Sequence, residues 1–100
     1  MTEKPNILLI VIDQFRGDLL TDSPLGRIAK LPNLHALMGE AVTFPHHYSV
    51  VAPCAPSRAS LLTGQYAMNH GVVRNGTPLR HDTPNLATEI RKASGHSPPS

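Results

Sequence analysis

A short, uninterrupted apolar run near the N-terminus constrains the fold of this chain more than any other feature. Residues 7–12 read Ile-Leu-Leu-Ile-Val-Ile, and the charged Asp13 follows them directly. An apolar run without polar alternation suits a strand that is buried on both faces, as in a parallel sheet. We therefore predict a β-strand over residues 6–12, which requires neighbouring strands on both sides and helices over both faces.

A first helix is predicted behind Pro32, because proline is favoured in the first turn of a helix. The apolar side chains that follow recur at the spacing of a helix, so they lie on one stripe of it. These residues are Leu34, Leu37, Met38, Ala41 and Val42. Residues 42–51 then read as an irregular extended segment.

Two more helices are predicted in the second half of the chain. One spans about residues 56–63 and ends at Gly64, since glycine commonly stops helices. The other begins at Thr83 as N-cap and ends at Gly95. Residues 65–82 contain glycine and proline breakers and are predicted to form a loop.

The order strand, helix, extended segment, helix, helix indicates an α/β architecture with a mainly parallel sheet between helices. One hundred residues are enough for at most one small domain. In such a fold another strand would follow the last helix, and the sequence ends without one. We therefore expect residues 1–95 to be the N-terminal part of a larger domain and residues 96–100 to be a truncated tail.

Charge and composition exclude several classes of function. The nine Lys and Arg residues are scattered and only 4% of the chain is aromatic, whereas nucleic-acid binding needs a basic stripe and stacking platforms. A single cysteine excludes an internal disulfide. The apolar run is too short for a signal peptide or a membrane span. We therefore expect a cytoplasmic protein that binds neither nucleic acid nor membrane.

The only cysteine, Cys54, stands just before the predicted helix at residues 56–63. The N-terminus of a helix presents free N–H groups and a partial positive charge, so it favours anions. Arg58 lies one turn further on and could pair with the same anion. A lone cysteine is more often an ordinary buried residue, but the residues around Cys54 favour a functional interpretation.

Asp13 and Gln14 follow the predicted strand, at the carboxyl end where α/β folds place ligand sites. Carboxylate and amide oxygens suit hard divalent cations such as Ca²⁺, Mg²⁺ or Mn²⁺. An aspartate at this point can equally cap a loop. The local sequence by itself leaves both interpretations of Asp13 open.

Three segments resemble the sulfatase family of the alkaline-phosphatase superfamily. The strongest is residues 54–64, Cys-Ala-Pro-Ser-Arg-Ala-Ser-Leu-Leu-Thr-Gly, which closely resembles the signature of that family. Asp13-Gln14 and residues 68–79 look like the phosphonate monoester hydrolase and arylsulfatase branch. Ser57 is typical of sulfatases rather than of phosphonate monoester hydrolases, so the sequence does not separate the two substrate classes.

The resemblance implies an alkaline-phosphatase-like fold and hydrolysis of small sulfate, phosphonate or phosphate esters. A formylglycine-generating enzyme would oxidise Cys54 to formylglycine, the nucleophile. The modified residue would also bind a divalent metal (Ca²⁺, or Mn²⁺ or Mg²⁺) together with Asp13 and Gln14. Arg58 would act beside the nucleophile and Asn75 would contact the substrate oxyanion. An asparagine beside a glycine also fits a simple turn.

Sulfatase-like enzymes complete their metal site with residues from much later in longer chains. The resemblance therefore implies that these hundred residues alone are inactive and poorly stable. Two alternatives stay open: a hydrolase that uses the unmodified Cys54 thiol with His70 as base, and a non-catalytic chain or small binding domain that retains the motif. Arg16 and Asp18 match the family pattern, and a local salt link explains them equally well.

Overall fold

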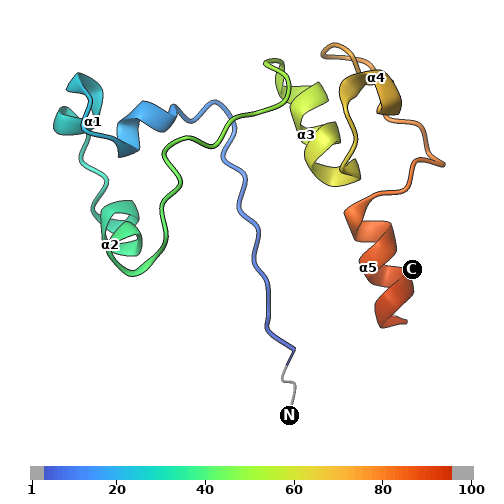
Figure 1. Ribbon diagram of the computed structural model, residues 1–100, viewed down its shortest axis with the longest axis horizontal. Coiled ribbons are helices and arrows are strands. Elements are labelled where there is room, and N and C mark those ends of the chain that lie inside the picture. The colour runs from blue at the N-terminus through green and yellow to red at the C-terminus, as the bar shows by residue number, and fades with distance from the viewer. Residues whose placement is uncertain (1–3, 96–100) are drawn as a thin grey trace. The chain divides into compact units, whose positions relative to one another are not determined.

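The computed structural model describes residues 4–95, so the predicted tail at residues 96–100 lies outside the described part. The chain divides between His47 and Tyr48 into two compact units. Within residues 4–95 the secondary structure is helical and contains no β-strand (Figure 1). None of the helices in this range is long and apolar enough to cross a membrane.

The predicted strand over residues 6–12 is absent from the described structure. Residues 7–12 carry no regular secondary structure, and their side chains are between 52% and 88% exposed. A strand exists only through hydrogen bonds to a neighbouring strand, and residues 4–95 offer no neighbour. The described residues therefore do not show the predicted strand, because the sequence pattern indicates a preference for burial and does not supply a partner strand.

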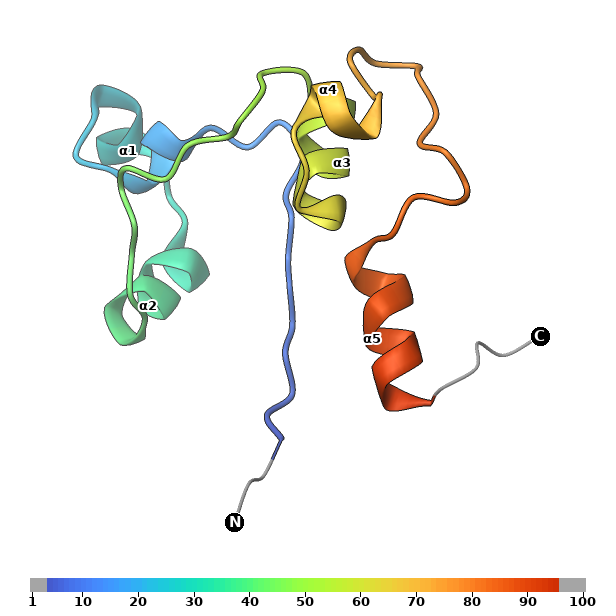
Figure 2. The same ribbon diagram turned by 45° about the vertical axis from the view of Figure 1, so that its right-hand side comes forward.

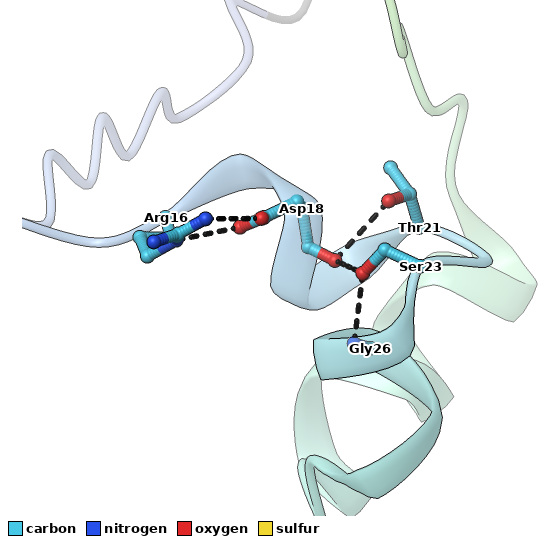
Figure 3. Close-up of polar contacts among 5 residues, drawn as sticks. All are labelled: Arg16, Asp18, Thr21, Ser23 and Gly26. Atoms are coloured by element: carbon cyan, nitrogen blue, oxygen red, sulfur yellow. Dashed lines mark hydrogen bonds and ion pairs between the residues drawn. The ribbon is translucent and has the colours of Figure 1, made fainter.

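The first unit contains a 3₁₀ helix, η1 (Gly17–Leu20), and two α-helices, α1 (Pro24–Ile28) and α2 (Pro32–Glu40). Helix η1 packs against α1. The corner between them is held by the Asp18 carbonyl, which accepts the Ser23 hydroxyl at 2.6 Å and the Thr21 hydroxyl at 3.1 Å. Ser23 in turn accepts the Gly26 N–H at 2.9 Å and so caps α1 (Figure 3).

Helix α2 confirms the prediction of a helix behind Pro32, which occupies its first turn. The helix ends at Glu40, so the last two members of the predicted apolar stripe lie beyond it. Leu34 and Met38 are half-buried, whereas Leu37 is 60% exposed. The stripe is therefore present, and the described part of the first unit covers only some of it.

The second unit consists of α3 (Cys54–Thr63), α4 (Ala67–His70) and α5 (Leu86–Ser94). Helices α4 and α5 both pack against α3, and α4 lies beside α3 in both views (Figures 1 and 2). The buried residues of the described chain gather on α3, on α4 and just after α4. They are Pro56, Ala59, Ser60, His70 and Val72.

The helix stops in the second unit agree with the sequence, and one helix start does not. Gly64 and Gly95 both adopt the left-handed conformation, with φ of 68° and 67°. Helix α5 starts two residues later than predicted, because Asn85 rather than Thr83 is its N-cap. Asn85 accepts the Thr88 N–H and donates its own N–H to the Thr88 hydroxyl, which forms a reciprocal capping box.

Candidate active site

Helix α3 begins at Cys54, two residues earlier than the sequence indicated. Pro53 is the N-cap, with φ of −65° and ψ of 143°, and its carbonyl accepts the Ser57 N–H at 3.1 Å. Pro56 in the first turn has no N–H, so this helix end has fewer donors to satisfy than an ordinary one. Cys54 thus stands at the positive end of a ten-residue helix, with an exposed thiol.

Asn75 meets Cys54 across a separation of 21 residues. Its Oδ1 accepts the Ala55 N–H at 3.0 Å and the Cys54 thiol at 3.4 Å. Because the Ala55 N–H is a donor, the atom that faces it must be the amide oxygen, which fixes the orientation of the amide. Asn75 therefore caps the first turn of α3 from a distant loop. The Nδ2 hydrogens of the same amide lie near this helix end.

The motif serine, Ser57, holds the segment that leads into α3. Its hydroxyl lies 2.6 Å from the hydroxyl of Ser49. The Ser49 hydroxyl donates to the Val51 carbonyl at 2.8 Å. A hydroxyl carries one hydrogen, so Ser57 is the donor of the Ser49–Ser57 bond. Sequence analysis did not single out Ser49, and its spacing from the motif carries no signal that would have revealed it.

Arg58 is exposed on α3, four residues after Cys54. Residues at this spacing share one face of a helix. Arg58 therefore lies on the same side of α3 as the exposed thiol, and its pairing with an anion stays a prediction. An anion held at this end of the helix would lie within the influence of the guanidinium charge.

His70 is not placed as a base for the Cys54 thiol. Its Nε2 lies 2.9 Å from the Ser60 hydroxyl, and its Nδ1 accepts the Val72 N–H at 3.1 Å. Both ring nitrogens therefore have structural partners. The alternative of a thiol nucleophile activated by His70 gains no support from this arrangement.

Asp13 and Gln14 occupy an exposed turn in the first unit. Gln14 has φ of 54°, a left-handed conformation that is uncommon for a residue other than glycine and that recurs at functional sites. Their carboxylate and amide oxygens suit a hard divalent cation. Within residues 4–95 no group of three or more His, Cys, Asp or Glu side chains could hold a metal ion. A metal site at Asp13 and Gln14 therefore stays a prediction.

Arg16 and Asp18, just after this turn, form a two-pronged ion pair. Arg16 donates from Nε at 3.0 Å and from a terminal nitrogen at 2.6 Å to the two carboxylate oxygens of Asp18 (Figure 3). The hydrogen bonds from Arg16 hold the pKa of the Asp18 carboxyl below its usual value. The local salt link considered for these residues is therefore present.

A shallow depression of about 180 Å³ lies elsewhere on the second unit. It is lined by Gln65, Asn69, His70, Arg80 and residues 82–84. Neither Cys54 nor Asn75 lines it. This depression is therefore separate from the start of α3, where Cys54 and Asn75 lie.

Comparison with known proteins identifies the family. The Sulfatase family model matches residues 5–95. The chain belongs to the sulfatase family. Membership implies an alkaline-phosphatase-like α/β fold. No solved structure matches the chain significantly.

The relatives of this chain carry different names. The chain is 46% identical to the multifunctional alkaline phosphatase superfamily protein PehA of Trinickia caryophylli, over 98% of this chain and 20% of that protein. It is 37% identical to a choline-sulfatase of Rhizobium meliloti, over 92% of this chain and 18% of the relative. It is 38% identical to an arylsulfatase of Clostridium perfringens, over 94% and 20% respectively. The chain thus spans about a fifth of the length of these relatives.

Proposed function

We propose that the full-length protein hydrolyses sulfate esters or phosphonate and phosphate esters, and that residue 54 is its nucleophile. The observation that carries this proposal is the meeting of Cys54 and Asn75 at the first turn of α3. A nucleophile, an amide and a helix N-terminus there face the same small volume, which suits attack on a tetrahedral anion. The sulfatase relatives support the reaction class.

Three side chains of the second unit have a proposed role in this reaction: those of Cys54, Arg58 and Asn75. Cys54, after oxidation to formylglycine by a formylglycine-generating enzyme, would supply a hydrated aldehyde. One hydroxyl of the hydrate would attack sulfur or phosphorus and displace the alcohol of the ester. The second hydroxyl would then lose its proton and expel the sulfate or phosphonate, which restores the aldehyde. Arg58 balances the negative charge of the bound ester from the same helix face. The Oδ1 of Asn75 is engaged on α3, so its Nδ2 hydrogens are the donors available to the substrate oxyanion.

Asp13 and Gln14 would supply ligands for a divalent cation, Ca²⁺ or else Mn²⁺ or Mg²⁺. The bound metal would lower the pKa of the nucleophile and neutralise the anion. The exposed turn and the left-handed Gln14 present both side chains outward. Within residues 4–95 no group of three or more His, Cys, Asp or Glu side chains could hold a metal ion, and we infer that the hundred residues alone are inactive.

The nucleophile is tested in the full-length protein, co-expressed with a formylglycine-generating enzyme. Cys54→Ala should abolish turnover of 4-nitrophenyl sulfate and of a 4-nitrophenyl phosphonate monoester, and wild-type peptides should contain an aldehyde at residue 54. His35→Gln, on the exposed face of α2, is the control and should retain full activity. Turnover that survives in Cys54→Ala would disprove the role of residue 54. Turnover by a protein whose Cys54 stays a thiol would support the thiol alternative.

The metal ligand is tested separately. Asp13→Asn removes one negative charge from a divalent site, so the metal content of the purified full-length protein should fall sharply and turnover with it. Unchanged metal content and activity would show that Asp13 only caps a loop. If no ester is hydrolysed by any preparation that contains metal and aldehyde, the non-catalytic alternative is correct.

A further inference from the structure

The small core of the second unit contains a polar pair that the proposed reaction does not use. His70 and Ser60 are only 3% and 8% exposed, among apolar neighbours that include Ala59 and Val72. Burying a polar group is costly unless it is hydrogen-bonded. Hydrogen bonds do accompany the burial, between His70 and Ser60 and from the Val72 N–H to His70.

The hydrogen bonds of His70 determine its tautomer. Its Nδ1 accepts the Val72 N–H at 3.1 Å, so in the neutral ring this nitrogen carries no hydrogen. The hydrogen is then on Nε2, which donates to the Ser60 hydroxyl at 2.9 Å. His70 thus links α3, through Ser60, to the main chain at Val72.

This link anchors the segment that carries Asn75. We call residues 71–75 the strap. One end of the strap is tied to α3 through Val72, His70 and Ser60, and the other end is tied to the first turn of the same helix through Asn75 and the Ala55 N–H. Gly71, with φ of 79°, allows the chain to turn from α4 into the strap.

We propose that His70 is a positioning residue, which sets the strap so that the Asn75 amide lies against Cys54 and Ala55. The proposal rests on the proposed function of Cys54 and Asn75. Only two residues lie between Val72 and Asn75, so a change in the position of Val72 should move Asn75 relative to α3. His70 acts through Asn75 and does not touch the reacting atoms.

Two substitutions at His70 divide its two hydrogen bonds. His70→Gln keeps a donor near the position of Nε2 for Ser60 and loses the acceptor for Val72. His70→Asn keeps an acceptor near the position of Nδ1 for Val72 and loses the donor to Ser60. Both are made in the full-length protein, with His35→Gln and His35→Asn as matched controls on an exposed histidine of α2.

The decisive measurement is a double-mutant cycle with Asn75→Ala, with kcat and KM per mole of formylglycine for 4-nitrophenyl sulfate and a 4-nitrophenyl phosphonate monoester. Each His70 variant should lower kcat/KM roughly ten- to hundredfold, as expected for coupled positions. In the Asn75→Ala background the same change should have almost no further effect, because the residue through which His70 acts is already gone. The His35 variants should be unchanged.

Additive losses in the cycle would overturn the proposal, because His70 would then act independently of Asn75. A lower melting temperature with unchanged kcat/KM would also overturn it. If the His70 variants do not fold, Ser60→Ala decides in the same cycle: a loss that vanishes in the Asn75→Ala background supports the proposal, and an unchanged kcat/KM contradicts it. If Cys54→Ala and Asn75→Ala both retain full activity, the proposed function itself has failed.

Discussion

At the scale of single residues, Asn75 uses its amide twice. The oxygen caps α3 by accepting the Ala55 N–H at 3.0 Å, and the nitrogen is the proposed donor to the substrate. The sequence alone is compatible with two interpretations of Asn75, a turn residue and a contact to the substrate. The contact with Ala55 and Cys54 shows that Asn75 has a tertiary role in addition to its place in a turn.

The two uses of the Asn75 amide can be separated by mutation. Asn75→Asp keeps the capping oxygen near the positive end of α3, so the stability of the full-length protein should be preserved. Its charge would repel an anionic ester, so KM should rise strongly. Asn75→Ala should cost about 1 kcal/mol of stability through the lost cap and lower turnover as well. Equal melting temperatures for Asn75→Ala and wild type would show that the cap has no energetic weight.

The pKa of the Asp18 carboxyl should lie below its usual value, because Arg16 donates hydrogen bonds to the carboxylate. Since its folded-state pKa lies below the unfolded value of about 3.9, the pair stabilises the fold above that pH and this contribution is lost as the pH falls through the folded value. An NMR titration of the Asp18 carboxyl should give a midpoint that rises in Arg16→Ala. The Asp22 midpoint is the control, because Asp22 pairs with Arg27. An Asp18 midpoint that is the same in Arg16→Ala and wild type would contradict the assignment of the lowered pKa to Arg16.

At the scale of elements, the short helices of the first unit differ in how closely other backbone atoms approach them. Gly26 is the third residue of α1, and a Cβ there would overlap the carbonyl oxygen of Thr21, between η1 and α1. Gly39 lies in α2, and a Cβ there would meet nothing within 4 Å. The two glycines therefore make a matched pair within the same unit.

Alanine should have opposite effects at these two glycines. Gly26→Ala should destabilise the full-length protein by about 1–3 kcal/mol through overpacking of the corner. Gly39→Ala should be neutral or stabilise by up to about 1 kcal/mol, because alanine is the better helix former. Urea unfolding midpoints measure both. A loss of stability at Gly39 as large as that at Gly26 would mean that the corner between η1 and α1 is not specifically constrained.

At the scale of the whole molecule, the chain exposes more apolar surface than it can cover. The run at residues 7–12 is largely exposed, and large exposed apolar patches mark surfaces that belong against other structure. We propose that this run forms a strand of a parallel sheet in the full-length protein. Residues 1–100 alone should then bind ANS, aggregate, unfold without a cooperative transition, and fail to hydrolyse esters with added Ca²⁺, Mg²⁺ or Mn²⁺.

Ile10→Asp tests the burial of this run in both contexts. In the isolated chain the substitution should reduce aggregation, because it interrupts an exposed apolar run. In the full-length protein it should prevent folding, because it would bury an unpaired charge in the sheet. Soluble, active full-length Ile10→Asp would show that the run is not a buried strand, and a sharp cooperative transition of residues 1–100 alone would contradict the expected instability.

The sequence by itself determined the features that depend on near neighbours. Pro32 marked the first turn of α2, Gly64 and Gly95 marked helix ends, and residues 54–64 indicated the family, because turns, caps and motifs are made by residues close together along the chain. One helix start was nevertheless predicted wrongly. Asn85 rather than Thr83 is the N-cap of α5, because only Asn85 has Thr88 at the spacing of a capping box.

Only the tertiary structure decided which distant residues meet. The contact of Asn75 with Ala55 and the burial of His70 against Ser60 depend on the path of the chain through α4 and the strap, which no local pattern specifies. The same reasoning explains the run at residues 7–12. Its apolar character was legible in the sequence, but a strand requires a hydrogen-bonded partner, and a partner is a property of the assembled fold.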